Sequence, residues 1–210
     1  MGTALAYAYL EKHPERVYNL ILVAPVFPFA PGAAPDNALL GELGLPVKDE
    51  IYLQGLQETY RANALKNEAR AIAQIKKEGL DHEPKTGFER TLKWQIGFAA
   101  SNIFYIDRWR QMRGGQSFYS PAVLKNFHKN AGGWESFLIK WNGFFPALKS
   151  FQGKTTFIVG ANDFIDPKVE FWPLLAQRLP LARLIVIESD GHMIWIDQPE
   201  IFAKSVLEAL

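Results

Sequence analysis

Three short stretches of consecutive apolar residues stand out along the chain: Tyr18 to Ala24, Thr155 to Gly160 and Arg183 to Glu188. Each is a continuous run rich in Val, Ile and Leu rather than an alternation, which predicts strands buried on both faces and therefore a parallel sheet. Helical patterns follow the last two runs, from Pro167 to Leu179 and from Pro199 to Leu210. Strands that alternate with helices predict an α/β fold.

Local signals mark where these helices begin. Asp166 before Pro167 is a favourable N-cap and first-turn pair, and Asp197 with Glu200 has the spacing of a capping box. The opening segment, Met1 to Leu10, is almost entirely apolar and has no capping residue. It predicts a fully buried helix that begins without a cap.

The middle of the chain has a different character. The Pro- and Gly-rich stretch from Pro25 to Pro46 predicts a linker, because proline is excluded from helix interiors and central strands. An amphipathic helical pattern follows from Asp49 to Glu78, and further helices are expected around Phe88 to Ile106, Ser120 to Lys129 and Trp134 to Trp141. We therefore expect a helical insertion between two strands of one sheet. It is rich in aromatic residues: Trp94, Phe98, Phe104, Tyr105, Trp109, Trp134, Trp141, Phe144 and Phe145.

Composition narrows the class of protein. The 210 residues are 48% hydrophobic and 21% charged, which is typical of a globular chain with a large core. Lys and Arg number 23 against 22 Asp and Glu, a net charge of +1, which argues against a nucleic-acid binder held by bulk charge. The apolar run from Leu20 to Pro31 is broken by prolines and too short to span a membrane. Without cysteine, no disulfide or thiolate metal site is expected.

Two residues suited to acid–base chemistry follow neighbouring strands. Asp163 lies just after the second predicted strand, and His192 lies in the Ser-Asp-Gly-His segment after the third. Parallel strands place their carboxyl ends at one edge of the sheet, so both side chains are expected at the same edge. A histidine held by a carboxylate can act as a general base.

Structural roles are the alternative for each of these residues. An aspartate after a strand often serves a turn or a helix cap, and Asp166 fits the cap role better than Asp163. A packed or surface position is the alternative for His192. Asp190 and the other histidines lack a comparable setting and are interpreted as structural or solvated; these are His13, His82 and His128.

The start of the chain completes the pattern. Met1-Gly2 opens a helix of small residues, and His13-Pro14-Glu15-Arg16-Val17 leads into the first strand. Here the sequence resembles the α/β-hydrolase superfamily, whose nucleophile elbow Gly-x-Ser-x-Gly turns from a strand into such a helix. In that register Gly2 is the last glycine of the elbow, and the backbone N–H of Met1 is an oxyanion-hole donor. The nucleophilic serine would directly precede Met1.

The resemblance extends to the other end of the chain. Gly160 to Pro167 is similar to the acid loop of that superfamily, and Gly191-His192 followed by Gln198 to Phe202 is similar to its histidine loop and last helix. The order nucleophile, Asp, His also agrees. The resemblance implies a catalytic domain formed by residues 1–26 and 144–210, with a helical cap at residues 27–143.

Two parts of the superfamily pattern are missing from the sequence. No Gly-x-Ser-x-Gly motif occurs, and no upstream Gly-rich loop supplies a second oxyanion donor. The fold implies roughly 100 further residues of preceding strands and helices. We therefore expect this chain to be the C-terminal part of a hydrolase and to be inactive alone.

The resemblance implies a serine hydrolase that cleaves an ester or amide bond of a small molecule or short peptide. The elbow spacing and aromatic cap are most similar to the prolyl aminopeptidase group. Such an enzyme needs no cofactor or metal. It is expected to bind neither nucleic acid nor membrane and to lie in the cytoplasm. The cap aromatics either line an apolar substrate pocket or form the core of the cap. Asp or Cys as nucleophile stays open, as does a non-catalytic binding or scaffold protein of the same fold.

Overall fold

The strands form one parallel sheet, as the apolar runs predict. In a computed structural model that describes residues 2–25, 50–112, 144–164 and 171–210, the strand order is β1-β2-β3. The strands are β1 (Asn19–Val23), β2 (Lys154–Gly160) and β3 (Ala182–Ile187), and β2 pairs with both neighbours in parallel. β2 is buried along nearly its whole length, whereas β1 and β3 are buried in part because they border the sheet among the described residues.

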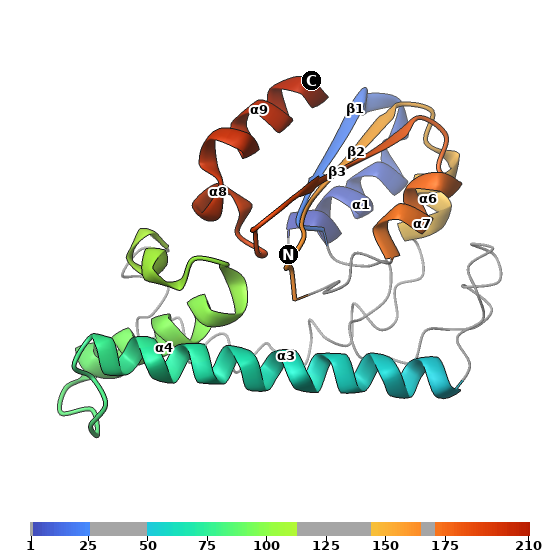
Figure 1. Cartoon of the computed structure of the whole chain (residues 1–210). Helices are drawn as coiled ribbons and strands as arrows, with labels where there is room; N and C mark the ends of the chain where they lie inside the picture. Colours follow the sequence, from blue (N-terminus) through green and yellow to red (C-terminus); the bar gives the residue numbers. More distant parts are fainter. Residues whose placement is uncertain (1, 26–49, 113–143, 165–170) are drawn as a thin grey trace.

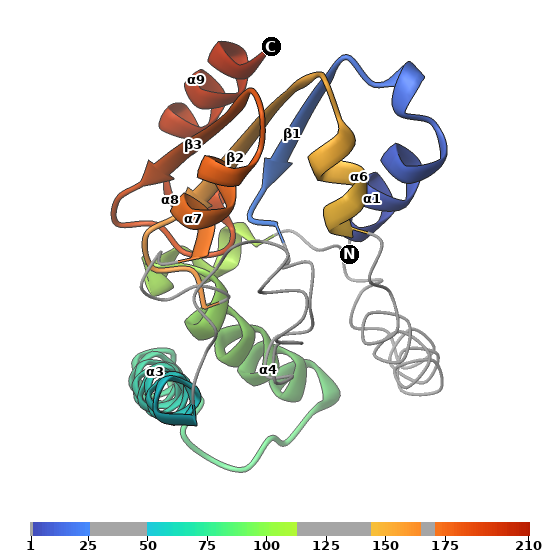
Figure 2. The ribbon, with the colours of Figure 1, turned by 90° about the vertical axis from the view of Figure 1, so that its right-hand side faces the viewer.

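Helices cover both faces of this sheet (Figure 1). On one face, α1, α6 and α7 pack against the strands through a core that includes Tyr7, Leu148 and Trp172. On the other, α8 and α9 pack through Ile194 and Phe202. Figure 2 views the sheet from the face that α1, α6 and α7 cover, with α9 behind it. The helices of these layers are α1 (Gly2–Lys12), the short 3-10 turn η1 (Pro14–Arg16), α6 (Phe144–Ser150), α7 (Phe171–Arg178), α8 (Ile194–Asp197) and α9 (Pro199–Ala209).

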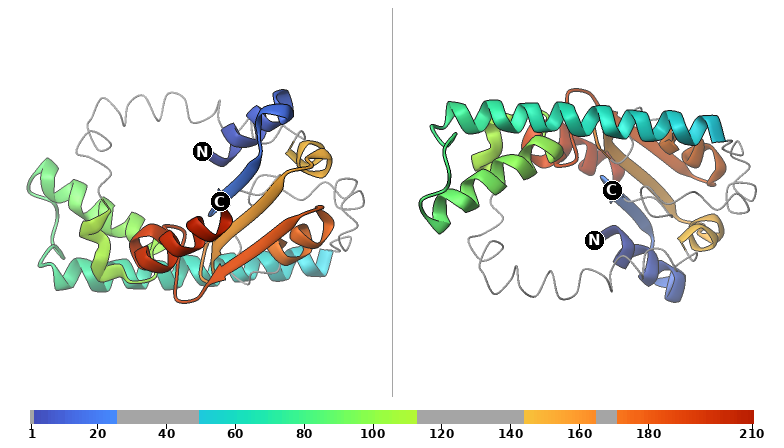
Figure 3. Two further views of the ribbon diagram at one scale, coloured as in Figure 1. Left: turned by 90° about the horizontal axis from the view of Figure 1, so that it is seen from above. Right: turned by 90° about the horizontal axis from the view of Figure 1, so that it is seen from below.

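The remaining described helices form a separate layer below the carboxyl ends of the strands (Figure 1). They are α3 (Glu50–Lys77), α4 (Gly87–Asn102) and the 3-10 helix η2 (Ile106–Gln111), and we call them the helical layer. Figure 3 shows that α3 runs on the β3 side of the sheet, away from α1. Its core includes Ile96, Ala99 and Trp109, and Ile196 of α8 packs into the same cluster.

Several predictions about helices need correction. The first helix is not fully buried: Tyr7 and Leu10 face the sheet, but Leu5 is 65% and Tyr9 48% exposed, because one face of α1 has no neighbour among the described residues. Asp197 does not cap the last helix. Gln198 occupies the N-cap position of α9 without a side-chain hydrogen bond, and Asp197 is fully buried with other partners.

Other predictions concern residues outside the described ranges. These are the linker from Pro25 to Pro46 beyond its first residue, the helices around residues 120–129 and 134–141, and the Asp166 cap. In the described ranges, no helix is both long and apolar enough to cross a bilayer.

Candidate active site

Asp163 and His192 meet at the carboxyl edge of the sheet. Asp163 follows β2 and is 2% exposed, whereas His192 lies between β3 and α8 and its side chain is 24% exposed. The His192 Nδ1 atom lies 2.9 Å from Asp163 Oδ2 and 3.1 Å from Oδ1. An ionised carboxylate only accepts hydrogen bonds, so this contact places the imidazole proton on Nδ1. The Nε2 lone pair is then the basic atom of the ring.

Two backbone hydrogen bonds join the loop after β2, which carries Asp163, to the end of β3 and the loop that follows it. The β2–β3 pairing continues past the strands: Ala161 N–H donates to the Ile187 carbonyl at 2.9 Å, and Asn162 N–H donates to the Asp190 carbonyl at 2.8 Å. Gly160 permits this approach, since a Cβ there would lie 2.2 Å from the Gly191 carbonyl oxygen. The carboxylate and the imidazole are thus positioned by rigid sheet ends rather than by independent loops.

Asp197 anchors the histidine loop from its buried side. Its carboxylate accepts hydrogen bonds from the backbone N–H groups of Gly191 at 3.0 Å, Phe104 at 2.6 Å and Tyr105 at 3.0 Å. One side chain therefore joins the loop that carries His192 to the start of η2. Sequence reasoning missed this role, although an aspartate ending the apolar run Ile194-Trp195-Ile196 was a signal of a buried acceptor.

Asp190 lies near Asp197 but differs from it in its hydrogen bonding. It is fully buried, and neither carboxyl oxygen has a hydrogen-bond partner among the described residues. Burial, with the nearby charge of Asp197, raises the pKa of the Asp190 carboxyl to about 8. The sequence leaves structural and solvated roles open for Asp190; in the structure it is buried, and its raised pKa keeps it neutral near pH 7.

Arg70 connects α3 to the end of α4. Its guanidinium donates to the carbonyls of Ala100 at 2.8 Å, Ile103 at 2.9 Å and Phe104 at 2.6 Å. Burial lowers the pKa of Arg70, and the charge of Asp197 opposes that shift. Arginine serves well here because its planar fork satisfies several helix-end carbonyls at once.

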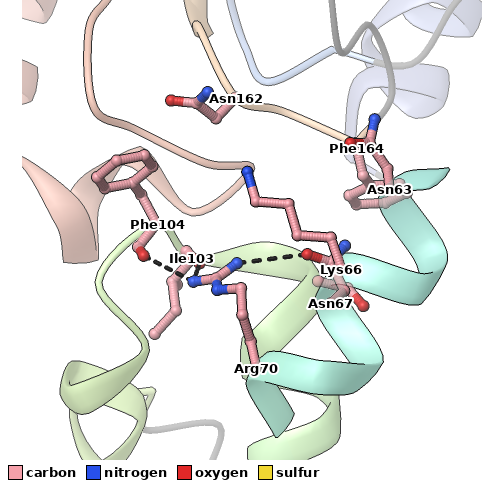
Figure 4. A pocket seen from close by; sticks show the side chains of 9 residues that line it. Asn63, Lys66, Asn67, Arg70, Ile103, Phe104, Asn162 and Phe164 are labelled. Atoms are coloured by element: carbon pink, nitrogen blue, oxygen red, sulfur yellow. Dashed lines mark hydrogen bonds between the residues drawn. The ribbon is translucent and has the colours of Figure 1, made fainter. Parts of the chain in front are cut away.

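A cavity of about 240 Å³ is lined by Asn162 and Phe164, the residues on either side of Asp163, although neither Asp163 nor His192 lines it. It lies between α3, the end of α4 and the loop after β2 (Figure 4). Phe164 lines it, and the Phe164 ring lies 5.1 Å from the His192 ring, centroid to centroid. Of the aromatic residues expected to form an apolar pocket, Phe104 lines this cavity, whereas Trp109 is buried in the core of the helical layer. The rest of its lining is largely polar.

The remaining site predictions have no structural counterpart here. Met1, the expected oxyanion donor, lies outside the described residues, but the start of α1 faces the edge of the sheet at which the strands end (Figure 1). Among the described residues, no group of three or more His, Cys, Asp or Glu side chains could hold a metal ion.

The sequence matches a known family along most of its length. Residues 1–199 match the family described as the alpha/beta hydrolase fold. The chain belongs to this family. The family fold also explains the parallel sheet with helices on both faces. No curated protein matches the chain by sequence.

Solved structures share this fold at low sequence identity. A meta-cleavage product hydrolase variant has a TM-score of 0.55 at 15% identity, with 98% of this chain and 60% of that chain covered. The 2-hydroxy-6-oxo-6-phenylhexa-2,4-dienoate hydrolase of a Rhodococcus strain has a TM-score of 0.51 at 15% identity, with 100% of this chain and 60% of that chain covered. An esterase from Exiguobacterium antarcticum has a TM-score of 0.48 at 17% identity, with 98% of this chain and 62% of that chain covered. The chain therefore spans about three fifths of their length.

Proposed function

We propose that this chain is the C-terminal part of a serine hydrolase that cleaves an ester or amide bond. The observation that carries the proposal is the two-oxygen contact between Asp163 and His192 Nδ1 at the carboxyl edge of the sheet. Asp163 fixes the tautomer and stabilises the imidazolium, while His192 Nε2 takes the proton of the nucleophile and returns it to the leaving group.

The nucleophile in this proposal belongs to the turn that enters α1. Family membership and the position of the α1 start at the same edge of the sheet support that placement. The serine Oγ attacks the carbonyl carbon, and the Met1 N–H stabilises the resulting oxyanion. Acylation then breaks the bond to the alkoxide or amine, and water completes hydrolysis. Without the serine this route is closed, so the 210 residues alone are expected to be inactive.

The genomic DNA tests the placement of the nucleophile. The codons directly before Met1 should encode Gly-x-Ser in the same frame, after about 100 residues with strand patterns. A stop codon immediately upstream would contradict the proposal and favour a non-catalytic binding protein.

Covalent labelling tests the chemistry. The natural gene product should react with a fluorophosphonate probe, His192→Ala should slow labelling about 10³-fold or more, and Asp163→Ala should slow it less. His13→Ala, at a partly exposed histidine that contacts Glu15 at 3.9 Å, is the matched control and should label normally. An unlabelled natural product, or normal labelling of His192→Ala, would overturn the proposal.

Substrate class is a finer part of the proposal. We place the protein with the prolyl aminopeptidases, on the sequence resemblance alone. Hydrolysis of proline naphthylamide in preference to simple aryl esters would support that assignment. Cleavage of the esters alone would contradict the aminopeptidase assignment and indicate an esterase.

A further inference from the structure

The cavity beside the Asp163–His192 pair is placed to receive part of a substrate. Asn162 lines it and directly precedes Asp163, and Phe164 lines it while its ring contacts His192. A group bound in this cavity would hold the rest of its molecule within reach of the imidazole. At about 240 Å³ the cavity is smaller than a pocket for a drug-sized ligand, so it suits one small substituent.

The charge of the lining is positive. Two cationic side chains, Lys66 and Arg70, border the cavity, and no carboxylate is among the described residues that line it. Arg70 is occupied by three backbone carbonyls and by Asn67 Oδ1 at 3.3 Å. Lys66 has no hydrogen bond or ion pair with any described residue. The exposed Lys66 ammonium therefore has no counter-ion among the described residues, whereas Arg70 lies near the charge of Asp197.

The direction of the Lys66 side chain supports a role in binding. Figure 4 shows the Lys66 amine extending from α3 across the cavity, toward the side where Asn162 and Phe104 lie. Asn67 directs its amide oxygen at Arg70, which leaves its NH₂ group to donate elsewhere. Asn63 and Asn162 add two further amides to the lining. An ammonium group with amide donors matches the hydrogen-bonding needs of an anion.

We propose that this cavity binds a carboxylate group of the substrate, with Lys66 as its ion-pair partner and a determinant of specificity. A single free ammonium balances the one charge of a carboxylate better than the two charges of a phosphate. The inference rests on the proposed function, because a carboxylate held at Lys66 places the scissile bond of the same molecule near His192. The alternative is a solvated lysine at the mouth of an otherwise unselective cavity.

The test compares a carboxylate with its neutral amide on the chain as it exists. Phenylacetate should bind about 10-fold more tightly than phenylacetamide, and that preference should weaken as salt rises. Chemical-shift changes in a ¹⁵N-labelled sample should centre on Asn162 and Phe104. Lys66→Met, which keeps the stem and a good helix former, should reduce the preference to about 1-fold, and Lys66→Arg should restore most of it.

Lys76→Met is the matched control, since Lys76 is an exposed lysine on the same helix and does not line the cavity. It should leave the preference intact. The proposal is overturned if phenylacetate fails to bind, if both compounds bind equally, or if Lys66→Met retains the preference. Fluorophosphonate labelling of the unmutated natural product tests the proposed hydrolase function without a carboxylate ligand, so failure of this inference is distinguishable from failure of that function.

Discussion

Aspartates lie on both sides of the loop between β3 and α8, but their surroundings differ. On the outer side, Asp163 is paired with a partly exposed His192 next to a cavity. On the inner side, Asp190 and Asp197 are both fully buried. A carboxylate beside an accessible base can take part in proton transfer, whereas Asp197, which is enclosed by backbone donors, holds the loop in place.

The two inner aspartates differ as much from each other as from Asp163. Asp197 accepts three backbone hydrogen bonds, which stabilise its negative charge. Asp190 accepts none among the described residues, so burial favours its protonated form. Burial makes Asp190 a neutral acid, whereas Asp197 holds backbone N–H groups and Asp163 contacts the imidazole of His192.

Removing Asp197 is expected to have the largest effect on this arrangement. Asp197→Ala leaves three N–H groups without their acceptor and should lower the free energy of unfolding by about 3–5 kcal/mol. Urea denaturation measures the change. Asp81→Ala, at an exposed aspartate, is the control and should shift stability by less than about 0.5 kcal/mol. A loss below about 1 kcal/mol for Asp197→Ala would contradict an anchoring role.

The effect of Asp190 should depend on pH: it is absent near pH 4 and becomes comparable with that of Asp197 only toward pH 8. Because its pKa of about 8 lies above the ordinary value, the folded protein retains a proton that the unfolded chain releases. The free energy of unfolding should therefore fall as pH rises from about 4 to about 8, by at most about 1.4 kcal/mol per unit. Below that window the group is protonated in both states and contributes no slope.

The variant Asp190→Asn keeps the shape and removes the titration. It should match the wild type near pH 4 and become increasingly more stable toward pH 8, as measured by thermal unfolding across that range. Asp81→Asn should keep the wild-type slope. Parallel pH profiles for wild type and Asp190→Asn would show that Asp190 is not a neutral acid in the folded state.

The sheet could be predicted from the sequence because its signals are local. Continuous Val/Ile/Leu runs mark all three strands, and the positions directly after two of them place Asp163 and His192 at one edge. The amphipathic pattern likewise predicts α3 to within a residue at each end. These features follow from residues close together in the chain.

Features that depend on distant segments could not be predicted in this way. The partners of Asp197 come from residues 104, 105 and 191, so its local capping-box spacing was misleading. Lys66 of α3 and Asn162 of the loop after β2 line the same cavity, and that arrangement depends on how α3 crosses the edge of the sheet. No local pattern encodes that crossing.

The tautomer of His192 tests the central claim most directly. In long-range ¹⁵N NMR spectra at a pH where the rings are neutral, His192 should carry its proton on Nδ1, because Asp163 can only accept there. Asp163→Ala should return the ring to the Nε2–H form that neutral imidazoles favour in water, while His13 stays unchanged. A wild-type His192 protonated on Nε2, or one indifferent to Asp163→Ala, would contradict the assignment of this pair as base and orienting acid.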